Sequence, residues 1–70
     1  MIMKPVHGSS FIAAIGYQNN ILRIKFVSGT LLEYHNVPQH IYNEFVRAGS
    51  KGRYYKSHIR GNFGGSKKIV

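Results

Sequence analysis

Leu32-Glu33-Tyr34-His35-Asn36-Val37-Pro38 is the stretch in which an alternating apolar and polar pattern runs into a proline. Such alternation is typical of a strand with one buried face. The residue before a proline is driven toward extended backbone, and proline itself suits the first position of a helix. The sequence therefore predicts that a sheet ends at residues 36–37 and that a helix begins at Pro38.

Two further strands are predicted ahead of this stretch. Residues 11–17 alternate between a large apolar face, which we expect to be buried, and an opposite face that begins with Ile12. Residues 21–27 alternate between apolar and basic side chains, as in a half-buried strand. Asn19-Asn20 between them suits a two-residue hairpin, because asparagine tolerates positive φ.

The second hairpin loop is predicted from the faces that it must join. A two-residue loop would bring Glu33 to the buried face, which one-sided burial disfavours. A three-residue loop at residues 27–29 instead places Ile24 opposite Leu32, and Arg23 opposite Glu33 on the outer face. We therefore expect a three-stranded antiparallel meander.

Two helices are predicted after Pro38. Apolar residues recur at helical spacing from Val37 to Ala48, which gives one stripe that can close over the sheet. Ser50 can cap a second, short basic helix at residues 51–60, although Gly52 costs that helix about 1 kcal/mol relative to alanine. The predicted fold class is α+β, a meander followed by one packed helix and a second short basic helix.

The chain length of 70 residues allows one small domain. We expect an ordered core at about residues 9–63, an irregular lead-in at residues 1–8 and a loose basic tail at residues 64–70. Without cysteine or a His-x-x-x-His spacing, no metal or cofactor is expected. With no signal-peptide pattern and no apolar run of membrane-spanning length, we expect a cytoplasmic protein.

Positive charge is concentrated in the last third of the chain. Ten Lys and Arg against two Asp and Glu give a formal net charge of +8. Seven of these cations lie in residues 47–70, which contain neither glutamate. A polyanion partner would be attracted by this segment, since each neutralised phosphate releases condensed counterions.

Arg53, Lys56 and Arg60 share one face of the second predicted helix, and Arg47, Lys51 and Tyr54 are nearby. These cations can follow a phosphate backbone while an aromatic side chain stacks on a base, and an ordinary solvated helix face gives the same pattern. Ser9, Ser10 and Ser50 could form a small anion site, although caps and turns also explain them. The predicted nucleic-acid-binding residues are Arg47, Lys51, Arg53, Tyr54, Lys56 and Arg60.

The outer face of the sheet is a second candidate surface, with Arg23, Lys25 and His35. The aromatic side chains with which open sheets stack RNA bases are missing from it. We expect this face to be covered by the second helix or by another subunit, so that a protein partner or a homodimer is the alternative there.

Catalysis has few candidate residues in this chain. A metal-independent ribonuclease would need a histidine and a lysine or carboxylate at one phosphate, such as His35 or His58 with Glu33 or Lys56. The predicted sheet turns Glu33 and His35 outward, and nothing fixes His58 against them. We therefore expect a protein that is not an enzyme.

An ordered series of short motifs resembles the KTSC domain, which occurs at the C-terminus of some lysyl-tRNA synthetases and as small stand-alone bacterial and phage proteins. The resemblance covers about residues 9–63. Its motifs are Ser9-Ser10-x-Ile12-x-Ala14-Ile15-Gly16-Tyr17, Leu22-x-Ile24-x-Phe26-x-Ser28-Gly29, Tyr34-x-x-Val37-Pro38, Ala48-x-Ser50-x-Gly52-x-Tyr54-Tyr55 and Ile59-Arg60.

The resemblance implies RNA binding, tRNA included, as proposed for the family from its attachment to a synthetase. The central Tyr-x-Tyr of the family is Leu32-Glu33-Tyr34 here, so any contact made by the first tyrosine is absent. Sequence and resemblance together predict a small non-catalytic RNA-binding module. The alternative is a protein-interaction module, such as a phage accessory protein that binds an acidic host protein.

Overall fold

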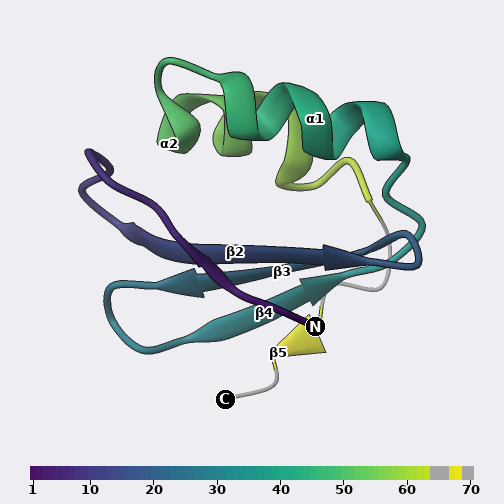
Figure 1. Cartoon of the computed structure of the whole chain (residues 1–70), viewed down its shortest axis with the longest axis horizontal. Helices are drawn as coiled ribbons and strands as arrows, with labels where there is room; N and C mark the ends of the chain where they lie inside the picture. The colour runs from purple at the N-terminus through teal and green to yellow at the C-terminus, as the bar shows by residue number, and fades with distance from the viewer. Residues whose placement is uncertain (64–66, 69–70) are drawn as a thin grey trace.

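The computed structural model describes residues 1–63 and 67–68, which form one antiparallel sheet with helices on one of its faces (Figure 1). The strands follow one another in the order β1-β2-β3-β4-β5. Their bounds are Lys4–Pro5 for β1, Ile12–Gln18 for β2, Ile21–Phe26 for β3, Leu31–Tyr34 for β4 and Lys67–Lys68 for β5. The α+β class and the antiparallel sheet are as predicted.

The helical layer begins directly after the stretch that ends at Pro38. Helix α1 spans Gln39–Arg47, and α2 spans Lys51–Tyr54 before it widens into the π-helix η1, Tyr55–Ile59. Pro38 is the residue before α1 rather than its first residue, because its ψ of 153° is still extended. The Ser50 hydroxyl accepts a hydrogen bond from the Arg53 amide and caps α2 as predicted.

Both hairpins have the predicted loops. Asn19 and Asn20 adopt positive φ values of 52° and 63° between β2 and β3. Gly29 has a φ of 98° in the next loop, and the Phe26 amide donates to the Thr30 carbonyl across it. The register of β3 and β4 follows from this three-residue loop, with Ile24 beside Leu32 and Arg23 beside Glu33.

The prediction of three strands was wrong, because a short strand adds to each edge of the meander. In β1, Lys4 lies beside Ile15 and Pro5 beside Ala14, within the segment predicted to be irregular. In β5, Lys67 lies beside Glu33. Each edge strand has two residues, too few for an alternating pattern to appear in the sequence. The remainder of the predicted loose tail, residues 64–66 and 69–70, lies outside the described residues.

A β-bulge in β2 corrects the predicted faces of the first strand. Ile12 lies beside Phe26, but Ala14 lies beside Lys25, so Ala13 is an extra residue in the ladder. Alternation inverts across such a bulge. Ile12, predicted on the outer face, is therefore in the core and is 1% exposed.

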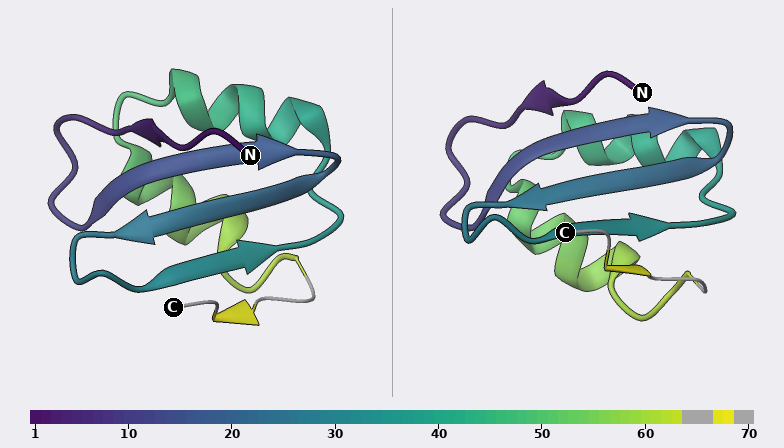
Figure 2. Two further views of the ribbon diagram at one scale, coloured as in Figure 1. Left: turned by 60° about the horizontal axis from the view of Figure 1, so that its bottom comes forward. Right: turned by 90° about the horizontal axis from the view of Figure 1, so that it is seen from below.

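The core lies between the sheet and the helices and contains side chains from every long element. One expectation was that the second helix covers the outer face of the sheet. It was wrong, because α2 and η1 lie on the same side of the sheet as α1 (Figure 2). Tyr55 and Ile59 of η1 are buried in this core. The buried apolar residues are Ile12, Ile15, Leu22, Ile24, Tyr34, Val37, Phe45, Tyr55 and Ile59.

None of the helices formed by residues 1–63 and 67–68 has the length and apolar character needed to cross a bilayer.

Candidate functional site

The candidate site forms where residues 7–11, here named the serine loop, approach α2. The Ser9 hydroxyl accepts from the backbone amides of Phe11 and Ile12 at 3.4 Å and 3.1 Å, which fixes the turn into β2. The turn directs the Phe11 ring toward Gly52. A Cβ added at Gly52 would lie 2.6 Å from Phe11 Cε1, so α2 can come this close only because residue 52 lacks a side chain.

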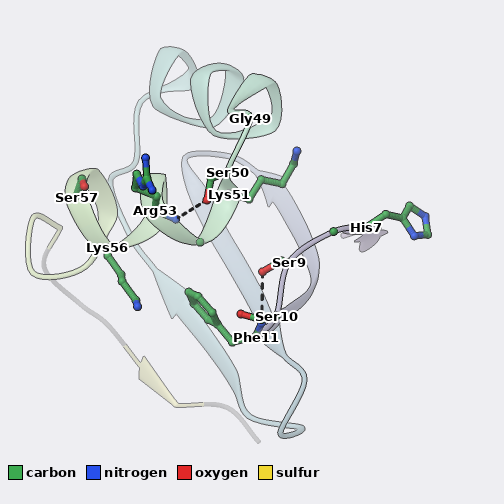
Figure 3. Close-up of a pocket in the computed structure, with 12 residues that line it drawn as sticks. His7, Ser9, Ser10, Phe11, Gly49, Ser50, Lys51, Arg53, Lys56 and Ser57 are labelled. Carbon is green, nitrogen blue, oxygen red and sulfur yellow. Dashed lines mark hydrogen bonds between the residues drawn. The ribbon is translucent and has the colours of Figure 1, made fainter.

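A hollow of about 540 Å³ opens between the serine loop and the α2–η1 helix, and we name it the basic hollow (Figure 3). The helix contributes three cationic side chains to its lining, and the loop contributes hydroxyl groups and His7 at one end. The residues with ionic, hydroxyl or aromatic side chains that line it are His7, Ser9, Ser10, Phe11, Ser50, Lys51, Arg53, Lys56 and Ser57.

Among residues 1–63 and 67–68, no carboxylate lines the basic hollow to oppose its positive charge. The chain has two acidic residues, Glu33 and Glu44, and neither lines the hollow. Glu33 is paired with Arg23 on the outer side of the sheet, and Glu44 accepts a hydrogen bond from the Tyr54 hydroxyl. The field at the hollow is therefore positive, which favours an anionic ligand.

Lys56 is held at the wall of the basic hollow by an aromatic ring. Its ammonium nitrogen lies 5.1 Å from the centroid of the Phe11 ring, within cation–π range. Phe11 in turn stacks on Phe26, with centroids 6.3 Å apart, and meets Tyr55 edge-on. The ring connects this cation to the hydrophobic core, so the position of Lys56 depends on core packing.

The predicted binding residues divide into two groups in the structure. Lys51, Arg53 and Lys56 all line the basic hollow. Arg47, at the end of α1, and Arg60, which follows η1 in extended backbone, do not line it. The predicted shared face with Arg60 assumed α-helical spacing, whereas the Arg60 amide bonds to the Tyr55 carbonyl, five residues back.

Tyr54 lies in the helical layer rather than in the basic hollow. Its ring stacks on His58 with centroids 4.3 Å apart and on Phe45 at 5.7 Å. Its hydroxyl donates to Glu44 Oε1 at 2.9 Å. Burial, together with this hydrogen bond, raises the pKa of Tyr54 to about 12. A base that stacks on Tyr54 would have to share the ring with these neighbours.

The second predicted surface contains a three-residue ionic cluster. Arg23 Nε donates to Glu33 Oε2 at 2.7 Å, and His35 Nε2 lies 2.7 Å from Glu33 Oε1. The hydrogen bond from Arg23, and next that from His35, lowers the pKa of Glu33. Lys25 lies on the same face and is exposed. Two of the three side chains predicted for this surface are thus engaged by one carboxylate.

Of the acid–base pairs considered for a ribonuclease, His35 and Glu33 lie together on the outer sheet face, whereas His58 and Glu33 lie in different layers. Tyr34 points toward the helices, where its hydroxyl meets that of Tyr55, so its neighbour Glu33 points away from them. His58 is in the helical layer against Tyr54. The structure therefore separates His58 from Glu33. Among residues 1–63 and 67–68, no group of three or more His, Asp or Glu side chains is arranged to hold a metal ion.

Sequence reasoning missed the contribution of Phe11, Gly52 and Ser57 to this site. The only signal for a hollow was the set of serines at positions 9, 10 and 50, which also has an explanation in caps and turns. Ser9 does fix a turn and Ser50 does cap α2, so these local roles gave no indication that both serines also line the hollow.

Comparison with known proteins places this architecture among described ones. The family model of the KTSC domain matches residues 8–63. The crystal structure of a KTSC domain protein from Yersinia pestis superposes with a TM-score of 0.91 at 37% sequence identity, over 99% of this chain and 97% of that chain.

Two sequence relatives have different lengths. The chain is 38% identical over 64 residues to a lysine–tRNA ligase from Nostoc, and the match covers 89% of this chain but 11% of the ligase. It is 33% identical over 63 residues to a protein from Tsukamurella paurometabola, of which it covers 92%. The same unit is thus found both within a large ligase and as most of a small protein.

Proposed function

The chain belongs to the KTSC domain family, and from that premise we propose that it is a small non-catalytic module that binds RNA through the basic hollow. Lys51, Arg53 and Lys56 contact the phosphate backbone there, and Arg47 and Arg60 extend the contact along the helical layer. The observation that carries the proposal is that three cations and several hydroxyls line one hollow, with no carboxylate among the described residues that line it.

A related protein supports RNA, rather than another polyanion, as the ligand. The lysine–tRNA ligase from Nostoc, whose name puts tRNA among its substrates, contains a segment that is 38% identical to this chain. Structured RNA such as tRNA is therefore the preferred ligand class. Contacts to phosphate position a nucleic acid without reading its sequence, so we expect little sequence preference.

The proposal is tested by a salt series with labelled tRNA, single-stranded RNA and duplex DNA. Wild-type protein is compared with the Arg53→Ala/Lys56→Ala/Arg60→Ala variant and with Lys4→Ala, which removes an exposed cation of β1. We expect RNA to be preferred and the log–log salt slope to fall by about one for each phosphate contact removed in the triple variant.

Lys4→Ala should leave that slope nearly unchanged, because Lys4 does not line the basic hollow. Circular dichroism establishes that both variants are folded. Equal weak binding of all three nucleic acids, or a slope that the triple variant does not change, would refute the proposal. The rival protein-interaction module would then be sought on the outer sheet face, where a homodimer or an acidic protein partner would bind.

A further inference from the structure

The hydroxyl groups of the basic hollow are arranged to donate hydrogen bonds. The Ser9 oxygen already accepts from the amides of Phe11 and Ile12, and the Ser50 oxygen accepts from that of Arg53. A serine hydroxyl that accepts from backbone amides still carries one hydrogen to donate. Ser9 and Ser50 can therefore each give a hydrogen bond to a ligand without losing the bonds that hold the backbone.

Ser10 and Ser57 add hydroxyls that, unlike those of Ser9 and Ser50, are not bonded to backbone amides of the described residues. Both line the hollow, from the loop side and the helix side respectively (Figure 3). Within residues 1–63 and 67–68, neither side chain has a hydrogen-bond partner in the protein. Each is available to a ligand at no cost in folding.

The side chains that line the hollow carry more positive charge than one phosphodiester can neutralise. Lys51, Arg53 and Lys56 carry three positive charges at the hollow, beside the serine hydroxyls. An internal RNA phosphate has one negative charge and two non-bridging oxygens, whereas a phosphomonoester has about −1.5 to −2 charges and three acceptor oxygens. Charge-assisted hydrogen bonds to such a group are the stronger ones. The lining matches the monoester better.

We propose that the basic hollow binds the terminal phosphomonoester of an RNA strand, so that the protein recognises phosphorylated RNA ends. This inference rests on the proposed function and makes it more specific. A hollow of about 540 Å³ lies within the roughly 300–1,000 Å³ typical of small-ligand sites, which leaves room for the terminal nucleotide as well as its phosphate. The shared chemistry is that of a 5′- or a 3′-phosphate.

The test compares short single-stranded RNAs that differ only at their ends. The full-length protein is titrated with a labelled RNA that carries a 5′-phosphate, a 3′-phosphate or hydroxyls at both ends. A hydroxyl-ended RNA two nucleotides longer controls for added charge. We expect a Kd about tenfold lower for one phosphorylated end, the change that one charged hydrogen bond typically gives. The two phosphorylated RNAs distinguish the two sources of the group.

Three variants distinguish recognition of the terminal phosphate from general electrostatic attraction to the RNA backbone. Ser10→Ala/Ser57→Ala keeps every charge and every backbone cap, and we expect it to reduce the preference for the phosphorylated end at least threefold. Arg53→Ala should reduce both this preference and overall affinity, whereas Lys4→Ala should leave the preference as it is.

The end-recognition proposal and the proposed function fail in different ways. If phosphorylated and hydroxyl-ended RNAs bind with equal Kd and a steep salt slope, end recognition is refuted while RNA binding stands. If no RNA binds, both are refuted. A phosphoserine peptide bound more tightly than the phosphorylated RNAs would also overturn the proposal and assign the hollow to a protein ligand.

Discussion

Two buried tyrosines join the sheet to the helical layer through their hydroxyls. Tyr34 of β4 and Tyr55 of η1 are 3% and 6% exposed, and their oxygens are 2.6 Å apart. One hydroxyl must donate and the other accept, so each satisfies a group that water cannot reach. Burial, and next the bond to Tyr34, raises the pKa of Tyr55.

Tyr55→Phe should destabilise the fold by about 1–3 kcal/mol, because it leaves the Tyr34 hydroxyl buried without its partner. The free energy of unfolding is measured by urea titration. Tyr34→Phe/Tyr55→Phe removes both hydroxyls and should cost no more than the single variant. Losses that simply add in the double variant would contradict the pairing.

Glu33 makes the stability of the fold depend on pH. Its pKa is lower in the folded chain than the ordinary value of 4.5, so its ionised form stabilises the fold above that pH. This stabilisation is lost as the pH falls below 4.5 and through the lowered pKa. We expect Glu33→Gln to be less stable than wild type at neutral pH, with the difference closing in acid.

Urea titrations of both proteins at about pH 7 and about pH 3 measure this difference. The Gln side chain has nearly the same shape but cannot ionise, so only the charge changes. A difference in unfolding free energy that is the same at both pH values would show that ionisation of Glu33 is not its source.

At the scale of elements, the approach of α2 to β2 depends on a bulge and a glycine. The bulge at Ala13 places Ile12 on the helical side of the sheet, and the turn at Ser9 brings Phe11 to the same side. Gly52 then accepts the Phe11 ring against the helix backbone. Glycine destabilises a helix relative to alanine, and the close packing of Phe11 explains why glycine is present at position 52.

Gly52→Ala should therefore destabilise the protein, although alanine is the better helix former. Overpacking against a ring held by Phe26 and Tyr55 costs about 1–3 kcal/mol, and helix propensity returns about 1 kcal/mol. We expect a net loss of about 1 kcal/mol in unfolding free energy. Phe11→Leu in the same chain should remove part of the loss, and a more stable Gly52→Ala protein would contradict the contact.

At the scale of the whole molecule, charge is separated between the two layers. The helical segment of residues 47–60 carries five cations and no acid. The outer sheet face offsets part of its charge through Glu33. Like charges in one compact segment repel one another, and this repulsion is screened by salt.

Salt should consequently stabilise the free protein. Raising NaCl from about 0.05 M to about 0.5 M shortens the Debye length enough to screen the helical segment, and we expect Tm to rise by about 4 °C, which corresponds to about 1 kcal/mol for a domain of this size. The Arg53→Ala/Lys56→Ala/Arg60→Ala variant should respond less. An equal or larger response in that variant would contradict this account.

Local rules of sequence determined the meander and its register. The residues at each turn have few backbone options: two asparagines at positive φ, a left-handed Gly29 and a rigid Pro38. The alternation of apolar residues then admits one pairing of β3 with β4. For the same reason the helices after Pro38 and the cap at Ser50 could be predicted, as could the concentration of charge after residue 46.

Tertiary packing decided what no local pattern contains. The edge strands β1 and β5 form only because β2 and β4 offer them partners. The bulge in β2 moves Ile12 to the buried face, and no pattern in the sequence indicates this bulge. The basic hollow joins residues 7–11 to residues 49–57, which are about forty positions apart. A site made by two distant segments depends on how the chain closes, and that is set by the packing of Phe11 against Gly52.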